Sequence, residues 1–389
     1  MNVHEPRLGA HFTSRRERGS DGLPTLSVTL DRGLVPRHTL ERRTETNLSP
    51  EAHLRVREGD IAYNMMRMWQ GASGLAEMDA LVSPAYVVLA PRKSADPRFA
   101  AYLFKLPEMI HRFWAYSYGL TDDRLRLYFN DFKRIPWDLP SLPEQKKIAE
   151  ILSTWDRAIE TTTKLIANAE AQRRALMQEL LTGKRRLKGF EGGEWRTVTI
   201  GRMGKVVGGG TPDSQVSEYW GGEIAWATPT DITRLRQRFI RSTERTITTS
   251  GLKNSSANIL PPGSLLVCTR ATVGDLAIAE VEMTTNQGFK SIIPSRAYDV
   301  EFLSYLFTFH KHEFVRYACG STFLELSKRD FEKRSFSMPG EKAEQTAIAE
   351  VLNNASLMVE CHQRKVETLC DEKRALMQQL LTGKRRVRL

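Results

Sequence analysis

The sequence predicts an α+β protein in which two mixed domains alternate with two long helices that pack against each other. Three observations support this class. A thirteen-residue phrase occurs twice, a heptad pattern leads up to each copy, and the segments before those patterns are loosely similar. The phrase is RALMQELLTGKRR at 174–186 and RALMQQLLTGKRR at 374–386, so only Glu179 and Gln379 differ. Self-similarity at a fixed spacing indicates a repeated structural unit.

The long helices are predicted from strict spacing. The 200-residue offset holds without a gap from Glu144-Gln145 and Glu344-Gln345 to the ends of the phrases. A helix requires such strict length, because one inserted residue rotates everything beyond it by about 100°. Apolar residues recur at alternating steps of four and three in both copies, with polar residues at the same two levels. The seam holds Ile148, Leu152, Trp155, Ile159, Thr162, Ile166, Ala169, Arg173, Leu176 and Leu180 in the first copy, and Ile348, Leu352, Ala355, Val359, His362, Val366, Leu369, Lys373, Leu376 and Leu380 in the second.

The ends of these helices carry recognisable signals. Ser141–Glu144 is typical of a capping box with proline in the first turn. Gly183 and Gly383 fit helix C-termini, and the Lys and Arg residues that follow favour that end of the helix dipole. Phosphate contact is the alternative role for these basic residues at 184–186 and 384–386.

The segments that precede the helices predict two α+β domains. Short β-like runs such as Gly59–Tyr63, Ala85–Leu89 and Ser264–Val267 accompany one helical segment near 97–116 or 299–318. The predicted order is therefore a domain at 1–140, a helix at 141–186, a domain at 195–338 and a helix at 339–389.

Composition limits the classes of function. The net charge is +11 and the pI about 9.5, which favours a polyanionic partner such as DNA or RNA, although solvated basic faces are the alternative. The longest apolar runs are too short to span a membrane, so we expect a cytoplasmic protein. The four cysteines form no C-x-x-C pair, and free thiols without a metal site are expected.

The second domain and the helices carry an ordered series of short motifs. The series consists of Gly208–Pro212, Tyr219–Trp226, Pro261–Ser264, Thr285–Phe289, Gly320–Thr322, Glu344-Gln345 and Leu380–Lys384. It resembles the specificity subunit of type I restriction-modification systems over essentially the whole chain. The first domain departs from the pattern, for example with Ser83–Tyr86 where the second has Asn286–Phe289. It resembles a divergent branch of the same domain type.

The resemblance implies two target recognition domains, each reading one half of a bipartite DNA site in the major groove. The helices would pair as an antiparallel coiled coil with pseudo-two-fold symmetry, set the spacing of the half-sites and dock two DNA-methylation subunits. Restriction or translocase subunits are possible further partners. AdoMet, ATP and Mg²⁺ would belong to those partners, so this chain would hold no cofactor or metal of its own.

The residues predicted to bind DNA combine basic side chains with amides and hydroxyls. Arg and Lys anchor phosphates or recognise guanine, and Asn and Gln can recognise adenine. The candidates are Arg15, Arg16, Arg18, Arg37, Arg67 and Gln70 in the first domain, and Thr228, Thr230, Arg234, Arg236, Arg270, Thr272, Asn286, Gln287 and Lys290 in the second. Asn286 and Gln287 equally fit a role in the turn before Phe289, and Tyr219, Trp220 and Trp226 favour a structural role.

Catalytic motifs are missing from the sequence. It contains no P-loop, no G-x-G-x-x-G, no Asn-Pro-Pro-aromatic tetrad and no G-x-S-x-G. We therefore expect a DNA-binding subunit that is not an enzyme. The alternative is a coiled-coil scaffold or assembly protein whose basic patches are incidental.

Overall fold

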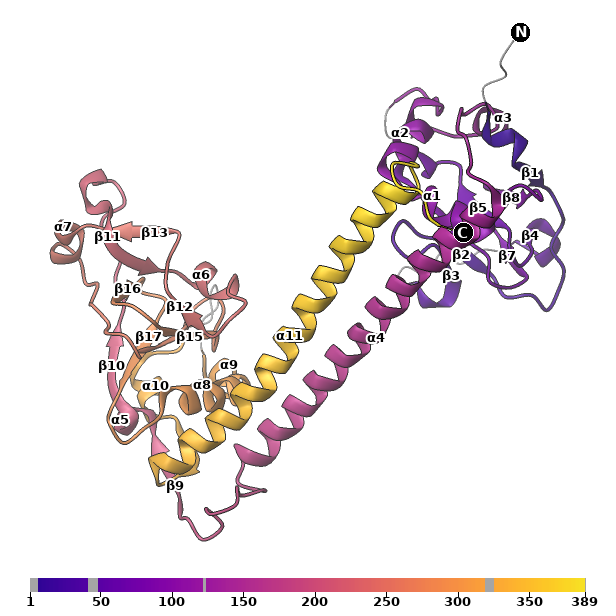
Figure 1. The fold of residues 1–389 in the computed structure, drawn as a ribbon. Coiled ribbons are helices and arrows are strands. Elements are labelled where there is room, and N and C mark those ends of the chain that lie inside the picture. Colours follow the sequence, from indigo (N-terminus) through magenta and orange to yellow (C-terminus); the bar gives the residue numbers. More distant parts are fainter. Residues whose placement is uncertain (1–5, 41–47, 122–123, 319–324, 389) are drawn as a thin grey trace. The chain divides into compact units, whose positions relative to one another are not determined.

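The computed structural model describes residues 6–40, 48–121, 124–318 and 325–388 (Figure 1). Cys319 and the predicted motif Gly320–Thr322 lie outside these residues. The chain forms two compact units: unit 1 contains 1–163 and 364–389, and unit 2 contains 164–363. The division passes through both long helices, so each unit contains one end of each.

The long helices are α4 (Leu142–Leu180) and α11 (Lys342–Leu380), each 39 residues in length. Every position of the predicted seam is buried or partly buried in both. The two helices pack together antiparallel: the start of α4 meets the end of α11 in unit 1, and the end of α4 meets the start of α11 in unit 2 (Figure 1). The predicted coiled-coil pair is therefore confirmed.

An ion pair joins the helix ends in each unit. In unit 1, Arg386 donates two hydrogen bonds to Glu144, at 2.6 and 2.5 Å. In unit 2, Arg186 does the same to Glu344, at 2.7 and 2.8 Å. Paired N–H donors matched to a carboxylate make a strong and directional contact. These ion pairs give Arg186 and Arg386 a structural role that was not predicted, while phosphate contact by the basic tails stays a prediction. Both oxygens of the Glu144 carboxylate accept from Arg386, in place of the backbone contact of the predicted capping box.

The glycines of the repeated phrase end the helices as predicted. Gly183 and Gly383 have φ angles of 71° and 72°, a left-handed conformation that glycine adopts at little cost. Beyond them the chain turns back, so that Arg186 and Arg386 reach the buried glutamates.

Unit 1 contains an antiparallel sheet that packs against short helices. Its strand order is β1 (Phe12–Arg15), β8 (Tyr86–Pro91), β5 (Ile61–Asn64), β6 (Ser73–Leu75). Two further strand pairs are β2 (Leu26–Val28) with β3 (Leu34–Pro36), and β4 (Leu54–Val56) with β7 (Ala80–Val82). The short α-helices of the unit are α1 (Pro97–Leu103), α2 (Pro107–Ala115) and α3 (Phe129–Phe132). Buried aromatic rings, including Phe12, Phe104 and Phe132, form its core together with Leu152 and Leu380 of the long helices.

In the described part of the chain, unit 2 contains more β-strands than unit 1. A five-stranded sheet has the order β10 (Gly204–Gly208), β17 (Lys290–Pro294), β14 (Leu265–Val267), β15 (Leu276–Ala279), β12 (Phe239–Ile240). A second sheet contains β13 (Arg245–Ile247), β11 (Trp220–Ala227) and β16 (Met283–Thr285), and β18 (Ser335–Pro339) pairs with β9 (Trp195–Thr199). The helices are α5 (Ile200–Met203), α6 (Pro229–Thr233), α7 (Thr249–Lys253), α8 (Val300–Phe309), α9 (Lys311–Tyr317) and α10 (Lys328–Lys333).

Each single helical segment predicted before the long helices is in fact two helices. Pro107 starts α2 after a break, since proline cannot continue a helix from the preceding turn. His310 separates α8 from α9 without a proline. The predicted segments near 97–116 and 299–318 therefore had nearly the right limits, but each is interrupted once.

The two units attach these helices to the long pair in the same way. Asp96 and Asp299 cap α1 and α8 by accepting from the backbone N–H three residues later. The backbone N–H of each aspartate donates to a buried glutamine, Gln145 or Gln345, at 2.8 and 3.0 Å. The repeated Glu-Gln pair thus joins both the helix ends and the domains.

Candidate nucleic-acid interface

In unit 2, three loops that carry predicted DNA-binding residues meet at Gly288. The backbone N–H of Thr269 donates to the Gly288 carbonyl at 2.8 Å. A Cβ atom at Gly288 would lie 3.6 Å from Pro229 Cγ and 3.7 Å from Arg270 Cβ, so the loops are in close contact. The structure therefore brings together the loop 228–236, the hairpin loop 268–275 and the turn 286–288. We call these segments the unit 2 loop cluster.

The amides and hydroxyls of the cluster mostly hold its shape. Asn286 Oδ1 accepts from the Gly288 N–H at 2.9 Å, which is the turn role weighed from the sequence. Gln287 accepts from the Thr211 hydroxyl. Thr228 forms a capping box with Asp231 at the start of α6. Thr230 is exposed, and Thr272 is partly buried.

The cations of the cluster are the groups most open to a ligand. Arg234 and Arg236 are exposed; Arg234 pairs with Glu244 at 2.6 Å, and both side chains are about two-thirds exposed. Arg270 lies 3.9 Å from Glu325. Exposed ion pairs of this kind contribute about 0–1 kcal/mol, so a phosphate can compete for these arginines. Lys290 lies outside the cluster, at the start of β17 beside the turn 286–288; it is partly buried, and burial lowers its pKa from the ordinary lysine value.

The same hairpin loop exists in both units. In unit 1 it joins β5 to β6 over 65–72 and carries the exposed Arg67 and Gln70; in unit 2 it joins β14 to β15 over 268–275 and carries Arg270 and Thr272. The next-to-last residue of each loop is a glycine of left-handed φ, Gly71 at 86° and Gly274 at 87°. Residues predicted separately for the two domains therefore occupy corresponding positions.

Ala271 stands at the exposed tip of the unit 2 hairpin loop with φ of 64°. It is the one non-glycine residue with positive φ among the residues that the structure describes. This conformation costs about 1–2 kcal/mol for an L-residue. Such strain is concentrated at binding and active sites, which favours this loop as a contact region.

In unit 1 a groove of about 730 Å³ lies beside the hairpin loop. Its lining includes Arg16, Met65, Tyr86, Tyr118 and Tyr128. Tyr118 and Tyr128 have ring centroids 5.7 Å apart, and Tyr118 is 58% exposed. The sequence reasoning missed these tyrosines. The one available signal was their position on both sides of the basic segment Arg124–Arg126.

The other residues predicted for unit 1 are spread out. Arg15 lines the groove, but its guanidinium donates to the buried Asp60 at 2.6 Å and is held within the unit. Arg18 and Arg67 are exposed outside the groove lining, and Arg37 is partly buried at the end of the β2–β3 pair. A larger cavity of about 1550 Å³, beside Tyr102 and Lys373, contains none of the predicted residues.

The tryptophans of unit 2 have the structural role expected of them. Trp226 is buried and donates to the Gly210 carbonyl at 2.9 Å, and Trp220 donates to the Asp213 carbonyl at 3.1 Å. The Arg245 guanidinium lies 3.7 Å from the Trp220 ring centroid. These contacts fix the glycine-rich segment Gly208–Gly210 to β11.

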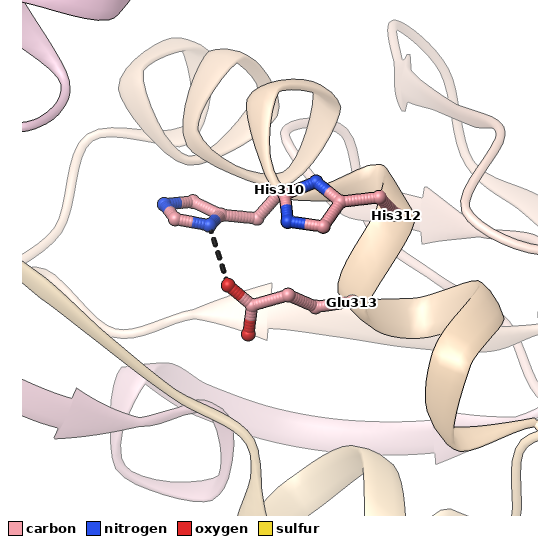
Figure 2. A group of neighbouring side chains, drawn as sticks. All are labelled: His310, His312 and Glu313. Atoms are coloured by element: carbon pink, nitrogen blue, oxygen red, sulfur yellow. Dashed lines mark hydrogen bonds and ion pairs between the residues drawn. The ribbon is translucent and has the colours of Figure 1, made fainter.

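One group of metal-ligand type occurs among the described residues: His310, His312 and Glu313 (Figure 2). His310 Nδ1 lies 2.8 Å from Glu313 Oε1, as the dashed line in Figure 2 marks. Glu313 is in the first turn of α9, where a carboxylate is already favoured by the helix dipole and a cation is not. The pair is therefore explained without an ion. Cys268, Cys361 and Cys370 are free thiols, as expected for them.

None of the helices in the described part of the chain is both long and apolar enough to cross a membrane.

Two α+β units, each with exposed basic loops and each built on one end of a repeated helix pair, define a recognition protein with a repeated frame. The family model described as "Type I restriction modification DNA specificity domain" matches residues 58–171 and 192–369. The chain belongs to this family.

Relatives agree with this assignment. The specificity subunit of the type I restriction enzyme MjaIX of Methanocaldococcus jannaschii is 38% identical over 178 residues, 45% of this chain and 41% of that protein. A type I restriction enzyme specificity subunit of Escherichia coli is 29% identical over 240 residues, 59% of this chain and 58% of that protein. The matches thus span about half the length of these curated relatives.

A solved structure from work on complex assembly and conformational transition of the type I R-M system has the same fold. The TM-score is 0.62 over 97% of each chain, at 18% sequence identity.

Proposed function

We propose that this chain is the DNA-binding specificity subunit of a type I restriction-modification complex, in which each unit reads one half of a bipartite duplex target. The observation that carries the proposal is the combination of a repeated frame with unlike loops. The Glu-Gln pairs, the cross-linking arginines and the capping aspartates recur in both units, whereas the exposed loop residues differ. Duplex DNA has a local two-fold axis, so a repeated frame can place two different readers on one site.

In this proposal the recognition surface of unit 2 is the loop cluster. Arg234, Arg236, Arg270 and Lys290 would meet phosphates or guanine edges. In unit 1 the surface would be the groove with Arg16, Tyr118 and Tyr128, together with Arg67 and Gln70 of the hairpin loop. Arg18 and Arg37 would contribute to the surrounding positive field, and Arg15 would support Asp60 rather than DNA.

The helix pair would set the half-site spacing and dock two DNA-methylation subunits, with restriction or translocase subunits as possible further partners. The chain itself would catalyse nothing, and AdoMet, ATP and Mg²⁺ would be held by those partners. A complex that acts on chromosomal DNA would be found in the cytoplasm. The E. coli and archaeal relatives named as specificity subunits support this assignment.

The first experiment identifies the DNA sequence that the complex recognises. Methylome sequencing of a host that carries this chain and its methylation subunit should give one bipartite motif. Fluorescence anisotropy with the assembled complex should then show binding to that duplex at least about 10³-fold tighter than to a scrambled duplex, with affinity that falls steeply as salt rises. Equal binding to both duplexes would leave a coiled-coil scaffold with incidental basic patches as the better explanation.

Single substitutions assign the loop residues. Arg236→Ala should reduce affinity for the target by about tenfold; if Arg236 contacts phosphate, the salt slope should fall by about 1, and if it reads a base, discrimination at one position should be lost. Arg202→Ala is the matched control, because Arg202 is an exposed arginine on α5 of the same unit. Equal effects of the two substitutions would exclude the loop cluster as the contact surface.

A further inference from the structure

Arg238 connects the loop 228–236 of unit 2 to the long helix pair. It stands directly before β12, and its side chain is one-quarter exposed. The guanidinium donates to Ser304 Oγ at 3.2 Å and to Glu301 Oε2 at 3.3 Å, both on α8, and also to Asn353 Oδ1 on α11. The Cζ atom of the Arg238 guanidinium lies 4.2 Å from the Tyr305 ring centroid, within cation–π range. A side chain next to the predicted reading loop is thus anchored on two helices.

The acceptors around Arg238 are themselves fixed. Asn353 Nδ2 donates to Glu301 Oε2 at 2.8 Å, and the Tyr305 hydroxyl lies 3.0 Å from both Asn353 Oδ1 and Ser356 Oγ. Burial raises the pKa of Tyr305, so its hydroxyl stays protonated. A planar guanidinium matched to several preset acceptors is held in one orientation.

The backbone of Arg238 joins the second loop of the cluster. Its carbonyl accepts from the Ile278 N–H at 2.8 Å, and β12 pairs with β15, the strand that follows the hairpin loop 268–275. Arg238 therefore fixes the C-terminal end of the loop 228–236, and its backbone bonds to β15, the strand that follows the hairpin loop 268–275.

Unit 1 has the corresponding tyrosine but a different cation. Tyr102 donates to Asp156 at 2.5 Å, and Lys373 of α11 pairs with the same carboxylate at 2.5 Å while lying 5.1 Å from the Tyr102 ring centroid. In unit 1 the cation near the tyrosine ring, Lys373, is on the long helix α11. In unit 2 the corresponding cation, Arg238, is in the domain that precedes α11, although Arg173, the repeat counterpart of Lys373, is also basic. This difference provides an internal control.

We propose that Arg238 is a positioning residue that fixes the loop 228–236 on the helix pair, so that Arg234 and Arg236 meet DNA in one geometry. The inference rests on the proposed function, in that the loop reads the half-site of unit 2. Arg238 itself does not contact DNA. Arg238 acts by fixing the positions of Arg234 and Arg236.

The test compares Arg238→Ala with Arg238→Lys, Lys373→Ala and Arg202→Ala in the assembled complex. Binding is measured to the target and to duplexes with single substitutions in either half-site. The half-site that cross-links to a photoreactive residue placed at the exposed position 230 marks unit 2. Arg238→Ala should lower discrimination there by about tenfold, the contribution of about one charged hydrogen bond. Discrimination at the other half-site and the salt slope should stay at the wild-type values. The lysine variant should restore part of the loss, and the two control variants should show none.

Amide hydrogen exchange supplies a readout that needs no DNA. Peptides covering 228–240 should exchange at least about tenfold faster in Arg238→Ala and not in Lys373→Ala. Asn353→Ala removes an acceptor instead of the donor and should give the same half-site effect without adding to that of Arg238→Ala. It keeps the proposal testable if Arg238→Ala fails to fold.

The outcomes separate the two proposals. If the wild-type complex prefers no duplex, the proposed function fails, and the exchange data alone decide whether Arg238 anchors the loop. If the wild type discriminates but Arg238→Ala and Asn353→Ala keep full discrimination with unchanged exchange, the positioning role is wrong. It is also wrong if both half-sites lose discrimination equally, because that result indicates general destabilisation.

Discussion

Lys290 illustrates what burial does to a single predicted DNA contact. The sequence placed it beside Asn286 and Gln287 and treated it as an ordinary cation. In the structure it is partly buried, and desolvation lowers its pKa, with Glu325 opposing that effect. A lowered pKa means that Lys290 loses its proton, and so its charge, at a lower pH than an exposed lysine does. Its attraction for phosphate should therefore weaken before the usual lysine range of about 10.4 is reached.

We predict from this that the target affinity of the wild-type complex falls with rising pH on the alkaline side, and that Lys290→Arg flattens that fall, because arginine stays charged there. Anisotropy titrations at fixed ionic strength between neutral pH and the ordinary lysine pKa measure it. Lys253→Arg, on the exposed surface of α7, is the matched control. Parallel profiles for wild type and Lys290→Arg would show that Lys290 makes no contact that depends on its charge.

Side-chain identity alone supplies candidate residues for DNA contact, but it does not show which of their donors and acceptors the fold already uses. Asn286 and Arg15 were chosen for their donors and acceptors, yet the turn at Gly288 and the buried Asp60 occupy those groups. Tyr118 and Tyr128 were overlooked because ten residues separate them in sequence and only the fold brings their rings together. Such information is held in tertiary contacts, which a local pattern does not contain.

At the scale of elements, the long helices could be predicted because their signal is local and periodic. Each seam position lies three or four residues from the next, and burial in both helices follows that spacing. The breaks at Pro107 and His310 were not anticipated, although proline gave a clear signal for the first. The pairing of Glu344 with Arg186 joins residues 158 positions apart, and only the repetition of both partners hinted at it.

The Arg186–Glu344 and Arg386–Glu144 ion pairs should differ in how much they contribute to the free energy of unfolding. The Glu344 and Glu144 side chains are both at most 5% exposed, but Arg186 is 19% exposed and Arg386 is 68% exposed. Glu344→Gln should therefore lower the free energy of unfolding by about 2 kcal/mol, since it leaves a mostly buried guanidinium without its counter-charge. Glu144→Gln should cost less, because water reaches Arg386.

Urea denaturation at constant m-value measures both changes. Addition of 1 M salt should shrink the effect of Glu144→Gln more than that of Glu344→Gln, because exposed charges are screened more strongly. A larger loss for Glu144→Gln, or the same salt response for both, would mean that exposure does not set the strength of these pairs.

At the scale of the whole molecule, the α+β class and the alternation of domains and helices followed from the internal repeat. The strand order did not, because the two units share few residues outside the frame. Unit 1 has a four-stranded sheet and unit 2 a five-stranded one, yet the hairpin loops and the capped helices correspond. The contacts of the frame recur in both units, whereas loops vary more readily than the elements that they connect.

The role of the helix pair as a spacer can be tested by lengthening both helices together. A second copy of 163–169 in α4 and of 359–365 in α11 keeps the alternation of four and three along the seam, so both ends retain their ion pairs. Each helix gains about 10 Å, which corresponds to about three base pairs at 3.4 Å each. The methylated motif should then keep the bases of both half-sites and contain about three more unspecified base pairs between them.

The control inserts the same seven residues in α4 alone. This single insertion leaves the two seams unequal in length, so the ion pairs at the two ends cannot both form, and we expect loss of thermal stability and of complex assembly. Methylome sequencing and size-exclusion chromatography compare the two variants. If the complex that contains the doubly lengthened protein assembles and methylates DNA at the original spacing, the helices act only as a docking platform, and the half-site distance must be set elsewhere in the complex.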